Sequence, residues 1–354
     1  MSAIIFKCPN CGGDLRFAPE KQMFQCEYCL SEFSRVQMEA ASEDGAFGAR
    51  TEEENADSGG QAEDAAMVYS CPSCGAEIVT DETTAATFCY YCHNPVVLAG
   101  RMQGEYQPDG VIPFVIDRTK ALEIFEQWIA GKKYLPRAFY APDQLEKMTG
   151  VYFPYWLYDC QVEGELEAEG KKQQSWTKGN VRFARIESYA VNRSGTMEIR
   201  HVARNALSKA NGKLAEGVMP FEPNRMEPFR MGYLSGFLAE KRDREKQLFS
   251  REIQEEVCAF AEQSLRSCVS GYDSVQYHKK ETRIVSPQWQ YVLMPVWIMT
   301  YRDPKTEKIC YFACNGQTGK VCGELPVDPG KLAGLFLTCF LPLLAVLLVI
   351  GYWI

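Results

Sequence analysis

The N-terminal region carries one cysteine pattern twice, and this repeat constrains the fold more than any other feature of the chain. Each copy reads C-x2-C-x14-C-x2-C, with the first copy beginning at Cys8 and the second at Cys71. Two C-x2-C pairs separated by a short spacer present four thiolates to one ion, which is what tetrahedral zinc requires. We therefore predict two structural zinc ions. Their ligands are Cys8, Cys11, Cys26 and Cys29 in the first copy and Cys71, Cys74, Cys89 and Cys92 in the second.

Other roles for these cysteines fit the pattern less well. Disulfides are typical of secreted chains, whereas the N-terminus offers no secretory signal and the other seven cysteines are scattered, as in a reducing cytosol. A redox dithiol needs one C-x2-C beside a βαβ unit, and iron–sulfur cysteines are usually spaced less symmetrically. His93 follows Cys92 but is not needed as a ligand, because four thiolates close the coordination sphere.

The two copies define two small modules, residues 1–34 and residues 67–101. A segment of about 30 residues cannot bury enough apolar surface to fold alone. Bound zinc supplies the missing free energy, on the order of 10 kcal/mol in comparable peptides. We expect each module to be a zinc ribbon that is folded only when it holds its metal.

Residues 35–66, between the ribbons, are predicted to be an acidic disordered linker. Positions 34–66 contain nine acidic and two basic residues, which account for seven of the eight net negative charges of the chain. Like charge and low hydrophobicity keep such a segment extended. With about 32 flexible residues it would give the first ribbon a reach on the order of 30 Å. A contact for a basic partner is the alternative role.

The C-terminal segment 332–354 is predicted to be a transmembrane helix. It contains no charged residue in 23 positions and is apolar on every side, which excludes a surface amphipathic helix. As a helix it would be about 34 Å long, enough for a hydrocarbon core of about 30 Å. Pro342 is tolerated in membrane helices. A helix buried in a large soluble core is the alternative, but such helices seldom run this long without a polar break.

The charge distribution around this segment predicts its orientation. Five basic residues precede it and none follows it. The positive-inside rule then makes the protein single-pass in the cytoplasmic membrane, with the N-terminal body in the cytoplasm and the C-terminus at the outer face. The basic residues are Arg302, Lys305, Lys308, Lys320 and Lys331.

Residues 105–328 are predicted to form a cytosolic α+β domain. Asp117 or Thr119 is expected to cap one helix, which ends at Gly131, and a second helix runs from Ser250. Each helix is followed by a strand of the pattern h-P-h-W-h, at 151–157 and at 292–298, which suggests an internal duplication. Helices and turn-joined strands in separate blocks indicate an antiparallel sheet. The residues of the second helix expected to face the core are Ile253, Val257, Phe260 and Leu265.

The sequence offers no recognisable catalytic constellation, so we predict that the protein is not an enzyme. No Gly-Lys pair has the glycine spacing of a phosphate-binding loop, and His201 and His278 are isolated. Cys310, Cys314 and Cys322 lie close together in the sequence and could form a third metal site with an outside ligand. The commoner interpretation of such a group is that its cysteines are buried for packing.

Zinc ribbons often bind nucleic acid, but these two lack the charge for it. Residues 1–33 hold three basic and four acidic side chains, and residues 67–100 hold three acidic and no basic ones. Each zinc–tetrathiolate centre adds two further negative charges, whereas phosphate binding needs clustered positive charge. Tyr28, Tyr90 and Tyr91 could stack on bases, but we expect them to contact protein.

Several stretches of the chain match a known bacterial family, namely the two C-P-x-C-G motifs and residues 111–114, 150–158, 233–237 and 315–319. In these stretches the chain resembles the TFIIB-type zinc-ribbon proteins with a C-terminal membrane helix, which are found beside phage-shock-type and SPFH-related envelope-stress proteins. The resemblance implies that a cytosolic or membrane-associated stress protein is recruited to the membrane, and it implies no enzyme.

The predicted function is therefore that of a membrane-anchored adapter that recruits cytosolic protein partners to the cytoplasmic membrane. Its partners would be proteins and, through the C-terminal helix, the lipid bilayer. The alternative is a nucleic-acid-binding zinc-ribbon protein connected with replication or transcription.

Overall fold

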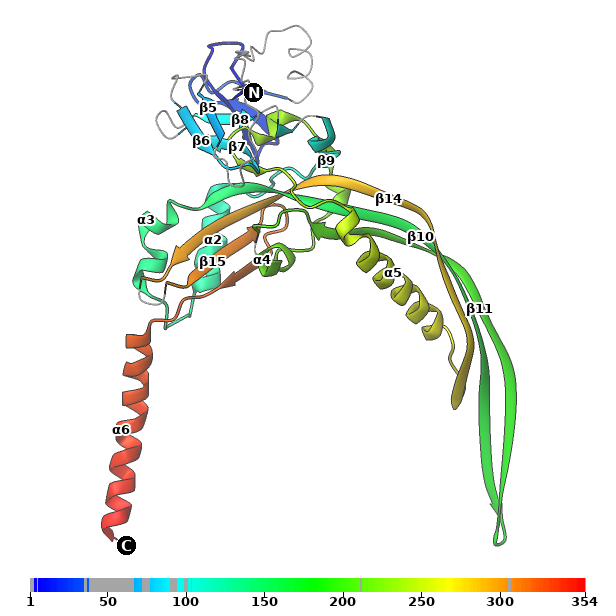
Figure 1. Cartoon of the computed structure of the whole chain (residues 1–354). Coiled ribbons are helices and arrows are strands. Elements are labelled where there is room, and N and C mark those ends of the chain that lie inside the picture. The colour runs from blue at the N-terminus through cyan, green and yellow to red at the C-terminus, as the bar shows by residue number, and fades with distance from the viewer. Residues whose placement is uncertain are drawn as a thin grey trace. The chain divides into compact units, whose positions relative to one another are not determined.

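The computed structural model divides the chain into two compact units (Figure 1). Unit 1 comprises Met1–Pro154, Leu207–Lys241 and Leu293–Ile354, and unit 2 comprises Tyr155–Ala206 and Arg242–Val292. The predicted acidic linker lies outside the described residues, apart from Gln37. The residues that the structure describes are 3–4, 6–34, 37, 67–71, 77–89, 94–98, 101–102, 104–210, 212–304 and 307–353.

The principal sheet is mostly antiparallel, which agrees with the predicted α+β class. Its strand order is β1-β8-β7-β13-β10-β14-β15-β16. One pair departs from the prediction, because β10 runs parallel to β13, with Val151 opposite Leu238. The strands are β1 (Ala3–Ile4), β7 (Thr84–Phe88), β8 (Pro95–Leu98), β10 (Thr149–Lys178), β11 (Val181–Asn205), β13 (Leu238–Glu240), β14 (Ser274–Arg302), β15 (Ile309–Asn315) and β16 (Val321–Glu324).

Smaller elements also occur among the described residues. The ribbons contribute β2 (Leu15–Ala18), β3 (Met23–Cys26), β4 (Glu32–Phe33), β5 (Met67–Ser70) and β6 (Glu77–Thr80). The remaining pieces are β9 (Gly110–Val111), β12 (Glu227–Pro228), α3 (Pro142–Leu145), α4 (Gly212–Gly217) and the 3-10 turns η2 (Gly104–Tyr106), η3 (Arg137–Tyr140), η4 (Pro223–Arg225) and η5 (Met231–Leu234).

Unit 1 is built around an aromatic core. Phe114 stacks on Phe237 with ring centroids 4.2 Å apart, and Trp297 meets Phe114 edge-on at 5.2 Å. Gly316 is required beside this core, since a Cβ atom there would lie 2.5 Å from the Phe114 ring. The Trp297 indole donates to the carbonyl of Ile116 at 2.8 Å, so the segment preceding the first long helix is fixed to the sheet.

Helix α2 (Arg118–Ile129) covers β15 within unit 1. The predicted cap is confirmed, because the Asp117 carboxylate accepts a hydrogen bond from the Lys120 amide at 2.8 Å. Phe125 packs edge-on against Phe312 of β15, with ring centroids 5.0 Å apart. Gly131, with φ 78°, follows the helix end, as predicted.

Unit 2 consists of the long β10–β11 hairpin, the first part of β14 and helix α5 (Gln247–Ser267) (Figure 1). The hairpin is paired from Tyr155 opposite Asn205 to Lys178 opposite Val181. The predicted segments 151–157 and 292–298 are indeed strands, but β10 and β14 extend far beyond them. The Trp156 indole donates to the carbonyl of Arg244 at 2.9 Å, close to the start of α5.

The prediction for the core face of α5 is wrong at one residue. Ile253, Val257 and Leu265 are buried as expected, but Phe260 is 61% exposed. The buried positions recur every four residues, so the buried stripe drifts around the helix by about 40° per step. At the level of Phe260 the stripe has reached Ala261, which lies about 100° away from Phe260.

Helix α6 (Pro329–Trp353) covers residues 332–353 of the predicted transmembrane segment and is long and apolar enough to cross a membrane. None of its candidate span, Pro329–Leu348, is buried against the rest of the protein. A short connection joins its first residue to Glu324, the last residue of β16. The base of the helix is attached to unit 1, because the Lys331 ammonium donates to the Leu135 carbonyl at 2.7 Å.

The α5 stripe gives a stability prediction. We expect Ile253→Ala to lower the free energy of unfolding by about 2–4 kcal/mol, because it leaves a cavity between α5 and the sheet. Phe260→Ala, on the exposed face of the same helix, should change it by less than about 0.5 kcal/mol. Urea unfolding of the full chain in detergent, followed by circular dichroism, measures both. Equal losses for the two variants would contradict the assigned orientation of α5.

Candidate metal centre

The structure brings the first four predicted ligands together. The sulfur atoms of Cys8, Cys11, Cys26 and Cys29 all lie within 4.8 Å of one another. Two of the separations are short, 3.6 Å between Cys8 and Cys29 and 3.5 Å between Cys11 and Cys26. A tetrahedral ion with Zn–S bonds of about 2.3 Å places its sulfurs about 3.8 Å apart. The four thiols therefore have the composition and spacing of a structural zinc site.

Two backbone turns of the same design present these sulfurs. The Cys8 amide donates to the Gly13 carbonyl at 2.7 Å, and the Cys26 amide donates to the Ser31 carbonyl at 3.0 Å. In both turns an amide bonds to the carbonyl of the fifth following residue. The turns thus fold back on themselves and point both cysteines of each C-x2-C pair to one side.

The residue after the second cysteine of each pair has left-handed backbone geometry. Gly12 has φ 74° and Leu30 has φ 60°, and their amides donate to the carbonyls of Cys8 and Cys26 at 2.8 and 3.0 Å. Glycine adopts this geometry without strain, whereas leucine does so at a cost of about 1–2 kcal/mol. The requirement at Gly12 was visible in the sequence. The equivalent role of Leu30 was not, because its residue type gives no such signal.

The four thiols lie in two environments. Cys8 and Cys26 are buried and, with Leu15, form the core of the ribbon, whereas Cys11 and Cys29 are exposed. Burial raises the pKa of the Cys8 thiol. A hydrogen bond between the Cys29 sulfur and the Ser31 hydroxyl, at 3.2 Å, lowers the pKa of Cys29 to about 6. The thiolate is the form that binds metal, so this hydrogen bond favours the metal-binding form of Cys29.

The first ribbon is docked on the rest of unit 1. Phe17 packs edge-on against Tyr233 with ring centroids 5.2 Å apart, and Phe24 packs against the same ring at 6.2 Å. The Phe17 amide donates to the Ser235 carbonyl at 3.2 Å, and the Ser235 hydroxyl donates to the carbonyl of Leu15. The expectation that the acidic linker gives this ribbon an independent reach is therefore wrong. Contacts with a segment far along the chain hold it in place.

Only part of the second predicted site lies within the described residues. Cys71 and Cys89 are buried there, while Cys74 and Cys92, together with His93, Tyr90 and Tyr91, lie outside them. The Cys89 amide donates to the Asn94 carbonyl at 2.9 Å, which is the same bond to the fifth following residue that closes both turns of the first ribbon.

The cores of the two cysteine modules correspond position by position. The second is a buried cluster of Tyr69, Cys71, Ile78, Cys89, Val96 and Leu98. The first five of these occupy the repeat positions of Phe6, Cys8, Leu15, Cys26 and Phe33 in the first ribbon. Strand β1 of the first module also pairs with β8 of the second, with Ile4 opposite Val97.

The other cysteines considered for a metal site do not form one among the described residues. Cys310 and Cys314 are buried in β15, and burial raises the pKa of Cys314 to about 12. Cys322 of β16 lies opposite Ala313. Within the described part of the chain, the cysteines of the first ribbon are the group arranged to hold an ion.

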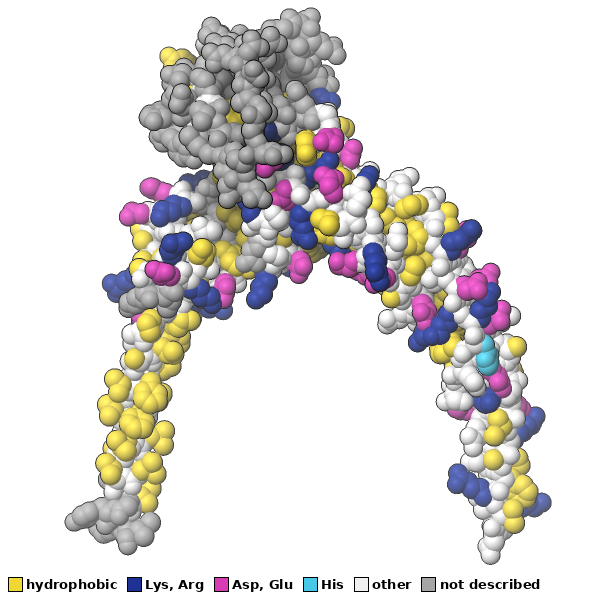
Figure 2. Space-filling model, in the orientation of Figure 1, with side chains coloured by type: hydrophobic (Ala, Val, Ile, Leu, Met, Phe, Trp, Pro, Cys, Tyr) yellow, Lys and Arg dark blue, Asp and Glu magenta, His cyan; other side chains and the backbone are white. Residues whose placement is uncertain are grey.

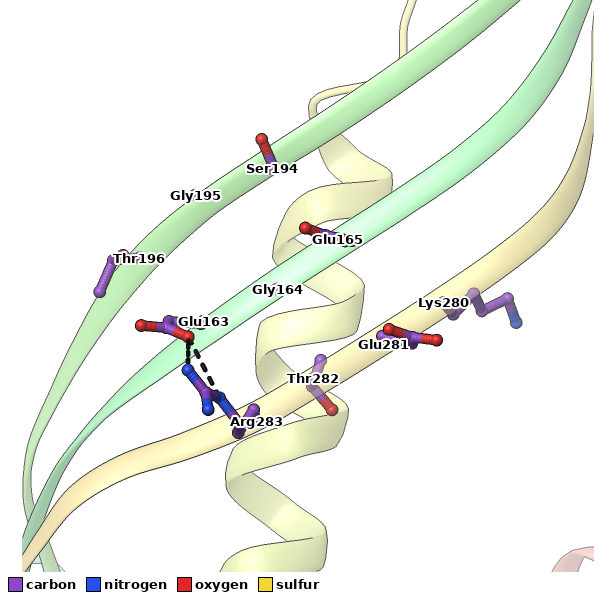
Figure 3. A pocket seen from close by; sticks show the side chains of 10 residues that line it. All are labelled: Glu163, Gly164, Glu165, Ser194, Gly195, Thr196, Lys280, Glu281, Thr282 and Arg283. Carbon is purple, nitrogen blue, oxygen red and sulfur yellow. Dashed lines mark hydrogen bonds and ion pairs between the residues drawn. The ribbon is translucent and has the colours of Figure 1, made fainter.

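A charged groove that the sequence did not reveal lies on unit 2 (Figure 3). It has a volume of about 890 Å³ and crosses β10, β11 and β14 where Gly164 pairs with Gly195. The Arg283 guanidinium donates to Glu163 at 2.6 Å, and Lys279 donates to Glu165 at 3.4 Å. The lining contains neither histidine nor cysteine, so the groove offers no nucleophile with an adjacent imidazole base.

Comparison with known proteins gives one extensive similarity. The chain is 30% identical, over 334 residues, to an uncharacterized protein of Bacillus subtilis (strain 168) named YdjG. The match covers 94% of this chain and 93% of that protein. No family model matches the chain, and no solved structure matches it.

The first ribbon allows a direct test of metal binding. We expect Cys26→Ser to lower the zinc content of the purified full chain by one ion per molecule, because a buried ligand is lost. Cys268→Ser, which changes an exposed cysteine in unit 2, should leave the zinc content unchanged. Mass spectrometric metal analysis of protein purified without chelator provides the measurement. An unchanged zinc content in the Cys26 variant, or iron in place of zinc, would count against the site.

Proposed function

The chain belongs to the family of Bacillus subtilis YdjG, and we propose that it is a membrane-anchored zinc-ribbon adapter that recruits protein partners to the cytoplasmic membrane. One observation carries the proposal. The four-cysteine ribbon is docked within unit 1, and the apolar helix α6 leaves that same unit shortly after its sheet ends. A small rigid surface and a helix able to span a membrane are thereby joined through one compact body.

The surface offered to a partner is the exposed turn of the first ribbon. Tyr28 is 84% exposed and Leu30 is 68% exposed, and both flank Cys29. Exposed aromatic and aliphatic side chains on a rigid turn are suited to a protein contact. A site closed by four thiolates leaves no position for water, which supports a structural role for the metal and an adapter that is not an enzyme.

The charges of the first ribbon support a protein partner over a nucleic acid. Each of its three basic side chains is already paired with a carboxylate of the same ribbon. Phosphate binding would have to displace these carboxylates. The pairs are Lys7 with Asp14, Arg16 with Glu27 and Lys21 with Glu32. Nucleic-acid binding remains the alternative function.

We further propose that the second module is a zinc ribbon as well, with Cys71, Cys74, Cys89 and Cys92 as ligands. The support is the buried core that matches the first ribbon position by position, and the backbone bond that Cys26 and Cys89 share. The chain would then hold two zinc ions.

A second duplication is proposed for the α+β body. In each half a proline–X–tryptophan strand is preceded in sequence by a long helix. The Trp156 indole bonds to the Arg244 carbonyl just before α5, and the Trp297 indole bonds to the Ile116 carbonyl just before α2, so each tryptophan bonds at the start of the other half's helix. Trp156 and β10 belong to one half, and Trp297 and β14 to the other.

The proposed location rests on the basic residues that precede the uncharged segment 332–354. We propose a single-pass protein with its body in the cytoplasm and its C-terminus at the outer face. The partner would be a cytosolic or membrane-associated protein, with phage-shock or SPFH-type stress proteins suggested by the family resemblance.

The ribbon surface can be tested without disturbing the metal site. Tyr28→Ala combined with Leu30→Gly removes both exposed side chains, and glycine at position 30 keeps the left-handed turn. We expect the yield of co-purified partner from membranes to fall about tenfold or more, the loss typical of central interface residues. Zinc content should remain that of the wild type.

The control for this experiment is Leu248→Ser, which removes a similarly exposed side chain (65%) from α5 in unit 2. Its partner yield should match that of the wild type. Unchanged partners in the Tyr28/Leu30 variant would remove the first ribbon from the proposed role. Recovery that depends on DNA or RNA, shown by nuclease treatment, would favour the alternative function.

Anchoring by α6 gives a separate prediction. Removing residues 332–354 should move the protein from membranes to the soluble fraction after a high-salt wash, because the remaining chain keeps the Lys331 contact but loses the apolar helix. Immunoblotting of the fractions measures the shift. A truncated chain that resists salt and stays with the membrane would show that another segment anchors it.

A further inference from the structure

The tip of the β10–β11 hairpin, residues 172–187, has only two strands among the described residues. The third strand, β14, begins at Ser274, and the Asp273 amide before it donates to the Lys171 carbonyl at 2.8 Å. Past this point the two strands stay paired, from Lys172 opposite Glu187 to Lys178 opposite Val181 (Figure 1). At about 3.4 Å per residue the hairpin tip is about 24 Å long. A two-stranded ribbon of this kind is marginally stable in water on its own.

The hairpin tip exposes large apolar side chains. Trp176 and Phe183 lie directly opposite each other, with stacked rings 5.7 Å apart, and are 49% and 41% exposed. Val181 is 56% exposed and Ile186 is 62% exposed. Such a group at the end of a projecting ribbon stays in contact with water unless something covers it, and clusters of this type mark interaction surfaces.

The same segment is strongly basic in an acidic protein. The hairpin tip, residues 172–187, contains four basic side chains and one acidic one, while the whole chain has a net charge of −8. Arg185 is paired with Glu187 at 2.8 Å and Lys171 with Glu169 at 3.5 Å. Lys178 and Arg182 have no carboxylate partner among the described residues. In Figure 2, lysine and arginine side chains flank hydrophobic ones at the end of the hairpin.

The remainder of β10 has the opposite character. Glutamates occupy every second position at 163, 165, 167 and 169, and the first two are paired with Arg283 and Lys279 of β14. Along β10 the basic side chains therefore lie only from Lys171 outward, beside the exposed aromatic pair.

We propose that the hairpin tip binds an anionic phospholipid bilayer, with Trp176 and Phe183 inserted at the level of the headgroups. Aromatic side chains are enriched at this depth, because the headgroup region borders apolar hydrocarbon on one side and water on the other. Lysine and arginine side chains beside the rings attract anionic lipids. The proposal rests on the membrane location proposed above, since α6 would keep the hairpin tip at high effective concentration near the bilayer. Cations beside aromatic rings also suit single-stranded nucleic acid, but the apolar helix in the same chain favours lipid.

Photocrosslinking of the full chain in lipid nanodiscs tests the contact. Trp176→p-benzoylphenylalanine places a crosslinker at the hairpin tip, and Phe260→p-benzoylphenylalanine places one at a similarly exposed position on α5 of the same unit. In discs of phosphatidylglycerol and phosphatidylcholine, we expect lipid adducts at position 176 at least about tenfold above those at position 260. Adding Lys178→Glu and Arg182→Glu should reduce the adducts at position 176 by about tenfold or more, as should discs of phosphatidylcholine alone.

The outcomes separate this inference from the proposed function. A chain that enters the discs but gives equal lipid labelling at positions 176 and 260 overturns the hairpin proposal and leaves the anchor intact. Adducts at position 176 to protein, or to an added single-stranded oligonucleotide in place of lipid, overturn it as well. A chain that does not enter the discs shows that α6 is no anchor, and both proposals then fail.

Discussion

The convergence of four thiols on one point is the interaction on which the N-terminal part of the structure depends. The fully buried core of the first ribbon consists of Cys8, Leu15 and Cys26, with Phe6 and Phe33 packed at its edge. So small a core cannot offset the entropy of ordering about 30 residues. A metal ion bound by the four sulfurs would close the ribbon and so fix the positions of Phe17 and Phe24, the two rings that pack on Tyr233. Loss of the ion would therefore affect the rest of unit 1 as well as the ribbon.

Local features of the fold were readable from the sequence, because they depend on neighbouring residues. Asp117 caps α2 as expected, and the spacing of Ile253, Val257 and Leu265 correctly identified the inner face of α5. The same periodicity places Phe260 on that face, three residues after Val257, but the buried stripe slants around the helix and passes through Ala261 instead. The four cysteines that converge in the first ribbon are also evident in the sequence, because C-x2-C spacing encodes a turn.

Features that depend on residues far apart in the chain could not be predicted from the sequence. Nothing in the sequence near Phe17 indicates that this residue packs against Tyr233 and bonds to Ser235. Likewise, nothing near Val151 indicates that it pairs in parallel with Leu238. The length of β10 was underestimated because its outer half, with glutamates at alternate positions, has few apolar residues on one face. The exposed aromatic pair at the hairpin tip was overlooked for a related reason, since Trp176 and Phe183 meet only across the turn.

The docking of the first ribbon also has a consequence for biosynthesis. Phe17 and Phe24 leave the ribosome early in synthesis. Their partner residues Tyr233 and Ser235 are synthesised only after the whole intervening chain. At a translation rate of about 5–20 residues per second, the interval lasts about 10–40 s. During that time the ribbon can acquire metal, but its apolar docking face has no partner from the rest of unit 1. The nascent chain therefore exposes an apolar surface for this interval. A chaperone or a second nascent chain can bind this surface before the native contact forms.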